Sequence, residues 1–288
     1  QYYPEHWPEA RWRVDIEMMK RAGVNTVRMG EFAWSALEPE EGHYTFEWLD
    51  HVLALLNENG IKTIMCTMSR TPPPWAFKKY PGIINIQQDG HVHRYGQRYT
   101  VGLSHPEFVE LSQRIDGKVI EHFAGNDAIV GWQIDNEVGG YNDCFCDHCL
   151  AQFRTYLRRR YGAVENLNEK WGANFWSFRF SDFDEVPLPK NQPQLALAYR
   201  RFMSEQNIAF ARWRAEKIRA LDPDKWITTN FQSFGASHTD YARLAPLLDY
   251  NGMNHYPPRS PELILDLYRY GGKPTLALEQ CTRLANKD

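Results

Sequence analysis

The amino-acid sequence predicts an α/β fold, a (β/α)8 or TIM barrel, built as one domain over residues 1–288. Short apolar and β-branched runs alternate along the chain with longer segments of helical periodicity, which is the pattern of parallel strands joined by helices. Several apolar runs end abruptly in charged or amide side chains, and in such barrels the C-terminal ends of the strands carry the active site. The length also fits, because a single barrel domain has about 250 residues.

Strands are expected where apolar or β-branched residues stand together between turn-forming residues. A first strand would end at residues 1–3, and the others are expected at 24–29, 61–67, 129–134, 226–231, 248–256 and 274–280. The chain stops soon after the last of these, so we expect a barrel that lacks its last strand and helix. A doubly wound open sheet is the alternative, but it would normally place a glycine-rich phosphate loop after the first strand. The segment after Tyr3 contains no such loop.

Helices are expected where apolar residues recur every three or four positions, and two of these segments stop at a glycine, Gly23 and Gly60, as helices often do. The expected helices are 9–22, 46–59, 106–124, 150–161, 194–221 and 261–270. A loop at 83–103, with Arg94 and Arg98, is long enough to suggest a function. The acidic, proline-rich stretch 182–193 is expected to be a surface connection, because the alternation of strands and helices resumes after it.

Composition excludes several classes of function. The formal net charge of -3 offers no basic footprint for nucleic acid, and no apolar run is long enough to cross a membrane. The amino terminus lacks the basic and apolar regions of a signal peptide, so we expect a cytoplasmic protein. Aromatic residues make up 14% of the chain, which suits a plain core as well as the aromatic faces of a sugar-binding site.

Two glutamates at the ends of strands are the candidate catalytic pair. The apolar strand 129–134 leads into Asn136 and Glu137, and the strand 274–278 leads into Glu279. A polar turn would explain the first cluster alone, but a second strand of the same design favours a shared site on one rim of the barrel. In the cleavage of a glycosidic bond, one glutamic acid could then protonate the leaving oxygen while the other attacks the anomeric carbon of the sugar. This is the layout of a retaining glycosidase, whose carboxyl groups are about 5 to 5.5 Å apart.

At these residues the chain resembles glycoside hydrolase family 42, a family of β-galactosidases. The resemblance spans essentially the whole chain. The motifs that carry it are YYPEHWP at 2–8, VRMGEFAW at 27–34, WQIDNE at 132–137, LNEKWG at 167–172, FWS at 175–177 and LEQ at 278–280. The Asn-Glu pair alone is shared by many related families, whereas the opening motif and the Phe-Trp-Ser insertion together are more specific.

The resemblance implies a retaining glycoside hydrolase that releases terminal β-D-galactose from β-galactosides, with Glu137 as acid/base and Glu279 as nucleophile. No cofactor is needed for this catalysis. The galactose contacts that it implies are Arg28, Asn136, Trp176 and Tyr256. It also implies a homotrimer, and further domains after the catalytic barrel that this chain does not contain. A barrel without its last strand would have unpaired edges, so we expect the chain by itself to be unstable or inactive.

Other interpretations stay open at this point. The enzyme could be a β-fucosidase or an α-L-arabinopyranosidase, because these sugars share the axial hydroxyl of galactose. A catalytically inactive sugar-binding barrel is a further alternative, which the presence of both glutamates disfavours. Arg28 could also be a residue of the barrel mouth that pairs with Glu31 or Glu279, where it would hold the nucleophile ionised. Trp176 could be plain core.

Three of the five cysteines, Cys144, Cys146 and Cys149, stand close together in the sequence. Their spacing suits reduced thiols or zinc ligands better than a disulfide framework. A structural zinc ion takes four ligands, and in family members with a metal site the fourth cysteine corresponds to Gly102 of this chain. The fourth ligand could instead be water or one of His105, Asp147 and His148, or the loop could be held by packing alone. A zinc hydrolase is disfavoured, since a closed thiolate cluster leaves no position for a catalytic water.

Overall fold

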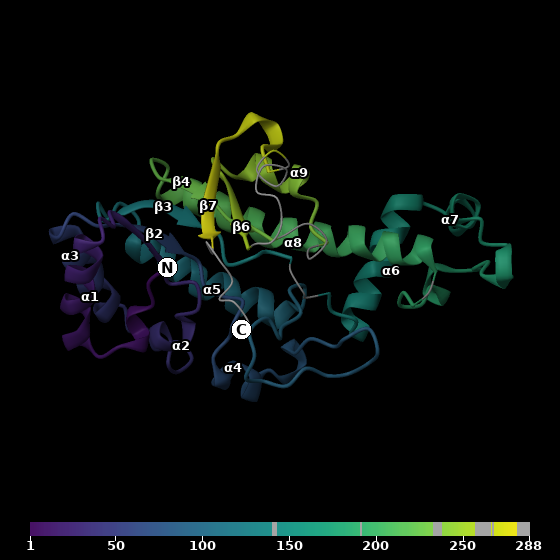
Figure 1. Ribbon diagram of the computed structural model, residues 1–288. Coiled ribbons are helices and arrows are strands. Elements are labelled where there is room, and N and C mark those ends of the chain that lie inside the picture. Colours follow the sequence, from purple (N-terminus) through teal and green to yellow (C-terminus); the bar gives the residue numbers. More distant parts are fainter. Residues whose placement is uncertain (140–142, 191, 233–237, 257–265, 267, 281–288) are drawn as a thin grey trace, which may run out of the picture.

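The computed structural model describes residues 1–139, 143–190, 192–232, 238–256, 266 and 268–280 (Figure 1). Within these residues the chain forms parallel strands in sequence order, β1-β2-β3-β4 and β5-β6-β7. Their bounds are β1 Thr26–Met29, β2 Lys62–Cys66, β3 Ile129–Gln133, β4 Trp226–Thr228, β5 Asn230–Phe231, β6 Asn251–His255 and β7 Thr275–Gln280. Only Thr229 separates β4 from β5, so the predicted strand 226–231 connects the two sheets. Consecutive parallel strands are the topology of a β/α barrel.

Helices stand between the strands, as the alternating pattern predicts. The α-helices are α1 Glu9–Arg21, α2 Trp34–Leu37, α3 Glu47–Glu58, α4 Pro74–Lys79, α5 Pro106–Phe123, α6 Asp147–Tyr161, α7 Val164–Trp171, α8 Pro193–Leu221 and α9 Tyr241–Leu244. The 3-10 helices are η1 Pro4–His6, η2 Pro81–Ile83, η3 Phe175–Ser177, η4 Phe183–Glu185, η5 Ala245–Leu247 and η6 Tyr270–Gly272. The expected helix at 261–270 lies largely outside the described residues. No helix in the described part of the chain has both the length and the apolar character of a membrane span.

The expected opening strand is not formed. Tyr2 donates a backbone hydrogen bond to the carbonyl of Arg28 at 2.9 Å, as a strand neighbour of β1 would. The chain then turns at Pro4 into η1. Proline has no N–H group to donate to a sheet, and the pairing therefore goes no further.

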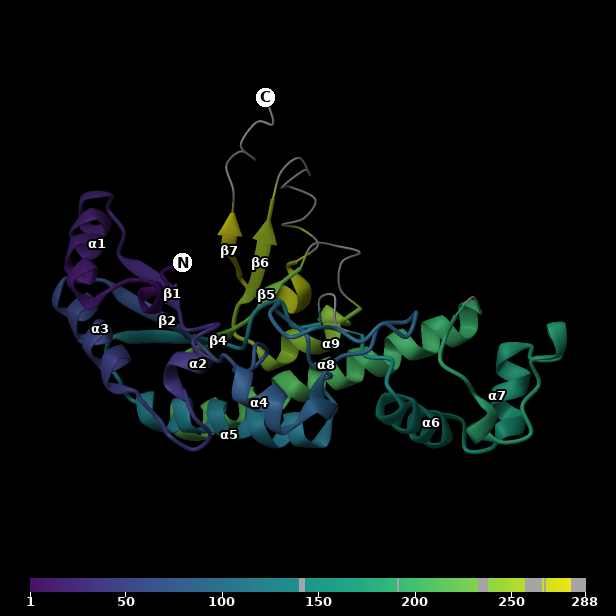
Figure 2. The same cartoon turned by 90° about the horizontal axis from the view of Figure 1, so that it is seen from below.

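The apolar core has two parts. The larger cluster surrounds the strands and contains Trp34 and Trp132. The smaller cluster lies between α6, α7 and the first half of α8, and contains Phe153 and Phe202. The long helix α8 connects them, because its second half contributes Ile218 to the larger cluster. In both views α6 and α7 extend away from the strands (Figures 1 and 2).

A buried polar network ties the outer helices to the segment after β2. Arg214 on α8 and Asp116 on α5 form an ion pair at 2.6 Å, and both bond to the hydroxyl of Ser69. Asp116 also accepts a hydrogen bond from the backbone N–H of Met68 at 3.0 Å. Such a satisfied network rigidifies its surroundings. It thereby fixes the next residue, Arg70, which reaches the loop after β3.

Candidate active site

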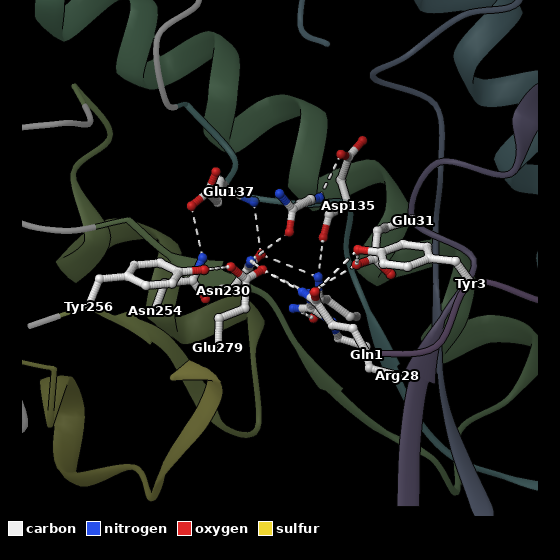
Figure 3. Close-up of polar contacts among 12 residues, drawn as sticks. Gln1, Tyr3, Arg28, Glu31, Asp135, Glu137, Asn230, Asn254, Tyr256 and Glu279 are labelled. Carbon is white, nitrogen blue, oxygen red and sulfur yellow. Dashed lines mark hydrogen bonds and ion pairs between the residues drawn. The ribbon is translucent and has the colours of Figure 1, made fainter. Parts of the chain in front are cut away.

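The C-terminal ends of β1, β3, β5, β6 and β7 bring polar side chains together around one cavity (Figure 3). This is the strand end at which barrels of this type place their chemistry. The cavity has a volume of about 310 Å³. Its lining consists of Gln1, Tyr3, Phe32, Arg98, Asn136, Glu137, Tyr256 and Glu279. Both predicted catalytic glutamates therefore face the same space.

Glu279 is surrounded by hydrogen-bond donors. Its Oε1 accepts hydrogen bonds from Arg28 at 2.7 Å, from the amide of Asn230 at 3.1 Å and from the amide of Gln1 at 2.8 Å. Its Oε2 accepts one from the hydroxyl of Tyr256. Burial and the contact with Glu279 raise the pKa of Tyr256, which keeps its hydroxyl protonated as a donor. These four donors hold both oxygens of the Glu279 carboxylate in place.

Arg28 connects Glu279 to the interior of the barrel. Its side chain is 4% exposed, and its Nη2 lies 2.9 Å from Glu31 as well as 2.7 Å from Glu279. Its Nη1 donates to Gln133 at 3.1 Å. Burial opposes the charged form, but the two carboxylates outweigh it and raise the pKa of Arg28. Arg28 thus makes both ion pairs considered from the sequence, and it lies behind Glu279 rather than in the lining of the cavity.

Glu137 stands on a loop with a strained backbone. Asp135 and Glu137 have φ angles of 48° and 52°, a left-handed conformation that costs on the order of 1–3 kcal/mol for such residues and needs support. Asn230 accepts a hydrogen bond from the backbone N–H of Glu137 at 2.8 Å, and Arg70 donates to its carbonyl at 2.9 Å. The Glu137 side chain accepts a hydrogen bond from Asn254 at 2.8 Å. Different residues therefore hold the backbone of Glu137 and its carboxyl group.

Asn136 and Asp135 are buried in the same loop. The side-chain oxygen of Asn136 accepts a hydrogen bond from Asn230 at 2.6 Å, and its amide donates to the hydroxyl of Tyr99. Asp135 is fully buried and accepts a hydrogen bond from the N–H of Asn136 at 2.6 Å. Burial raises the pKa of Asp135 to about 7 although Arg70 opposes the shift. Asp135 therefore titrates near neutral pH.

The two glutamates have different surroundings, and this difference suits different tasks. Glu279 contacts a guanidinium group and three neutral donors, which fix the orientation of its carboxylate. The Glu137 carboxyl group accepts a hydrogen bond from a neutral amide, that of Asn254. Two carboxyl groups whose environments differ in this way can divide the roles of nucleophile and proton donor.

Several residues of the site were not singled out from the sequence. Asn230 and Asn254 stand on strands 226–231 and 248–256, which were expected, but neither was named as a candidate. The signal was present, since both are polar residues near the C-terminal ends of apolar strands, as Glu137 and Glu279 are. Arg98 was named, because the length of its loop at 83–103 suggested a function, and it does line the cavity.

Trp176 is not brought to this cavity within its own chain. It lies in η3 after α7, is 76% exposed and stacks on Phe175 with ring centroids 5.0 Å apart. Both rings line a separate cavity of about 380 Å³, together with Trp171 and Leu195. In the two views, α7 lies far from the strand ends (Figures 1 and 2). Trp176 is thus exposed rather than core, and its contact with galactose stays a prediction.

The three clustered cysteines meet in space. The Sγ atoms of Cys144, Cys146 and Cys149 lie within 4.8 Å of one another, and within the described ranges no histidine or carboxylate joins this group. His148 instead contacts the carbonyl of Ser104 at 3.0 Å. A Cβ atom at Gly102 would lie 3.1 Å from the Sγ of Cys144, so this position faces the cluster. The thiols fit three of the four ligand positions of a structural zinc site.

Comparisons with known proteins agree with this geometry. The glycoside hydrolase 42 family model, described as β-galactosidase, matches residues 1–286. The β-galactosidase BgaA of Thermus sp is 42% identical over 263 residues, which are 89% of this chain and 41% of that protein. The crystal structure of the cold-adapted β-galactosidase from Rahnella sp. R3 matches with a TM-score of 0.92 and 34% identity, over 100% of this chain and 46% of the other. For the enzyme from the psychrophilic Marinomonas ef1, the TM-score is 0.91 and the identity 31%, over 97% and 47%.

These structural likenesses confirm the (β/α)8 barrel as the fold class. The chain spans less than half of the length of each of these three proteins. The family model, which matches residues 1–286, covers both glutamates.

Proposed function

Because the chain belongs to glycoside hydrolase family 42, we propose that its protein is a retaining β-galactosidase that releases terminal β-D-galactose from β-galactosides. The observation that carries the proposal is the pair Glu137 and Glu279, which line one cavity in different surroundings. The β-galactosidase names of the relatives support galactosides as the substrate class.

The first step forms a covalent intermediate. A carboxylate oxygen of Glu279 attacks the anomeric carbon, the bond to the leaving oxygen breaks, and Glu137 gives its proton to that oxygen. The product of this step is a galactosyl ester of Glu279. Arg28 supports the attack because it holds Oε1 of Glu279 in place at 2.7 Å.

The second step reverses the roles. Glu137, now ionised, takes a proton from a water molecule, and the resulting oxygen attacks the anomeric carbon. Galactose leaves with its configuration retained, and Glu279 becomes a free carboxylate again. No cofactor is required, since the two glutamates supply both the nucleophile and the proton transfers.

The galactose contacts are part of the proposal. Asn136 and Tyr256 line the cavity, and their amide and hydroxyl groups suit the hydroxyl groups of a sugar. Arg28 lies deeper, behind Glu279. Its buried Nε has no hydrogen-bond partner within the described residues.

We propose a homotrimer as the assembly. The support is the exposed aromatic pair Phe175 and Trp176, 69% and 76% exposed, at the border of the separate apolar cavity. Aromatic side chains are enriched in protein–protein contacts. In such an assembly Trp176 would contact galactose in the site of another copy. Light scattering on the wild type and on Trp176→Ala tests this, and a monomeric wild type would contradict it.

We also propose that Cys144, Cys146 and Cys149 hold a structural zinc ion that takes no part in the reaction. The clustered free thiols support this, and they also fit a reducing, cytoplasmic location. Because Gly102 offers no side chain, the fourth ligand would be water. Metal analysis of the purified protein should find one zinc per chain. A metal-free protein with unchanged thermal stability would contradict the proposal.

Turnover of aryl β-galactosides by the purified protein tests the main proposal, next to aryl β-fucosides and α-L-arabinopyranosides. We expect the highest kcat/KM for the galactoside, with β-galactose as the first anomer released, because a double displacement retains configuration. Release of α-galactose as the first anomer would contradict the mechanism. A higher kcat/KM for one of the other two sugars would show that this sugar, and not galactose, is the preferred substrate. Binding of galactose without turnover would indicate a sugar-binding barrel.

A further inference from the structure

Asn230 occupies a central place between the two catalytic glutamates. It is the first residue of β5, directly after the break at Thr229 where the two sheets meet. It is 1% exposed and does not line the cavity. Figure 3 shows its side chain between Glu279 and the backbone of Glu137. Asn230 is therefore placed to act on these residues and not on the sugar.

The Asn230 side chain makes four hydrogen bonds. Its Nδ2 donates to Oδ1 of Asn136 at 2.6 Å and to Oε1 of Glu279 at 3.1 Å. Its Oδ1 accepts from the backbone N–H of Glu137 at 2.8 Å and from Nε2 of Gln133 at 3.2 Å. Two donated and two accepted bonds match the full capacity of an amide. A flipped amide would place donor against donor and acceptor against acceptor, so the network allows one orientation.

This arrangement couples the two halves of the site. Glu137 has a strained backbone, with φ at 52°, and such a conformation persists only where surrounding contacts support it. Asn230 supplies one of these contacts at the N–H group. The same amide contacts the carboxylate of Glu279 on another strand. A change at Asn230 would release both groups at once.

We propose that Asn230 is a positioning residue that sets the separation and the relative orientation of Glu137 and Glu279. This inference rests on the proposed function, because its consequence is a rate. Arg28 and Tyr256 hold Glu279, and Asn254 holds the carboxyl group of Glu137. Asn230 joins the two groups through one rigid amide.

The first experiment is Asn230→Ala in the purified protein, measured with a series of aryl β-galactosides of different leaving-group acidity. We expect kcat/KM to fall about 100-fold, as a displacement of about 1 Å at a reacting centre can produce. The loss should appear with all leaving groups, including 2,4-dinitrophenol, because a displaced nucleophile slows every one of them. It should be largest for leaving groups that need protonation, because Glu137 is released as well. KM should change little.

The second variant, Asn230→Asp, separates positioning from a purely structural role. It keeps an oxygen to accept from Glu137 N–H, but it replaces the donor to Glu279 by a second negative charge. Like charges disfavour ionisation, so the acid limb of the kcat/KM profile should move to higher pH. Such a shift would show that the side chain at position 230 acts on the Glu279 carboxylate, whereas a side chain that contacted only the interior of the fold would leave this limb unchanged.

Asn251→Ala is the matched control. Asn251 is also buried, and it donates to the carbonyl of Tyr268 at 2.8 Å from the other end of β6. We expect this variant to lose thermal stability while kcat/KM stays within about twofold, as for a substitution away from the reacting groups. The inference is wrong if Asn230→Ala keeps kcat/KM within about threefold of wild type while the wild type hydrolyses the galactosides.

Crystal structures of wild type and Asn230→Ala test the same inference without activity. We expect the Glu279 carboxylate to move relative to Glu137 by more than coordinate error. Unchanged positions of both side chains would overturn the inference even if the wild type proved to act on another sugar. An inactive wild type with displaced carboxylates in the variant would contradict the proposed function and leave the positioning role supported.

Discussion

Arg28 and Glu279 stand 251 positions apart in the sequence, and their side chains meet at 2.7 Å. The contact joins the end of β1 to the end of β7, the first and last strands that the structure describes. It is nearly buried, with 4% and 14% of the two side chains exposed. An ion pair removed from water in this way depends strongly on both partners.

The carboxyl groups of Glu137 and Glu279 should be about 5 to 5.5 Å apart in an experimental structure, because a retaining mechanism needs direct attack by the nucleophile. A crystal structure of the protein measures this distance. A separation near 9 Å would leave room for a water molecule and would indicate an inverting enzyme instead.

Glu279→Ala should abolish turnover of every substrate, since it removes the nucleophile. Glu137→Ala should still cleave aryl galactosides whose leaving groups need no protonation, and azide should rescue it with β-galactosyl azide as the product. Product analysis by NMR identifies the anomer. If β-galactosyl azide forms with the Glu279 variant instead, the two roles are reversed.

Arg28→Met should destabilise the fold by about 3–5 kcal/mol, because it leaves Glu31 and Glu279 buried without their cation. The double variant Arg28→Met/Glu31→Gln removes one of these charges and should regain part of the loss in free energy of unfolding, but no activity. Chemical denaturation and turnover measure the two effects. Equal stability of the single and double variants would show that the burial of Glu31 is not the cause.

Gly131→Ala should destabilise the fold by about 1–3 kcal/mol, the usual effect of overpacking. A Cβ atom there would lie 2.2 Å from the ring of Trp226 on the neighbouring strand. Gly117→Ala is the control: its Cβ would meet Trp213 at an ordinary 3.6 Å, and within α5 the change should stabilise by about 0.5–1 kcal/mol. Thermal unfolding of both variants measures these effects. Melting temperatures that shift in the same direction in both variants would contradict this account.

Asp135 should make stability depend on pH. Burial raises its pKa from an ordinary 3.8 to about 7, so the folded chain holds the proton more tightly than the unfolded chain. Its contribution to stability is fully present below the unfolded pKa and is lost as pH rises through the folded one, from about 4 to about 7. The side chain of Asp135→Asn stays neutral at every pH. The unfolding free energy of this variant, relative to that of wild type, should therefore rise by a few kcal/mol from about pH 5 to about pH 8. The same difference between variant and wild type at both pH values would refute this.

Most of the fold could be predicted from local patterns. The strands ending near Glu137 and Glu279 and the helix ends at Gly23 and Gly60 follow from apolar periodicity and from glycine as a stop signal. Apolar periodicity was less informative where a single residue ends or interrupts a strand. Pro4 ends the expected opening strand, and Thr229 divides the expected strand 226–231 into β4 and β5.

Local sequence patterns were enough to predict the barrel class and the two candidate glutamates, because an apolar run that breaks into carboxylates is a local signal. Which side chains meet depends on the folded arrangement of the strands. It placed Asn230 between the glutamates, put Asn254 against Glu137 and Arg28 behind Glu279, and left Trp176 exposed and away from the cavity. These relationships depend on how strands that are distant in the sequence curve toward one another, and no local pattern of apolar and polar residues carries that information.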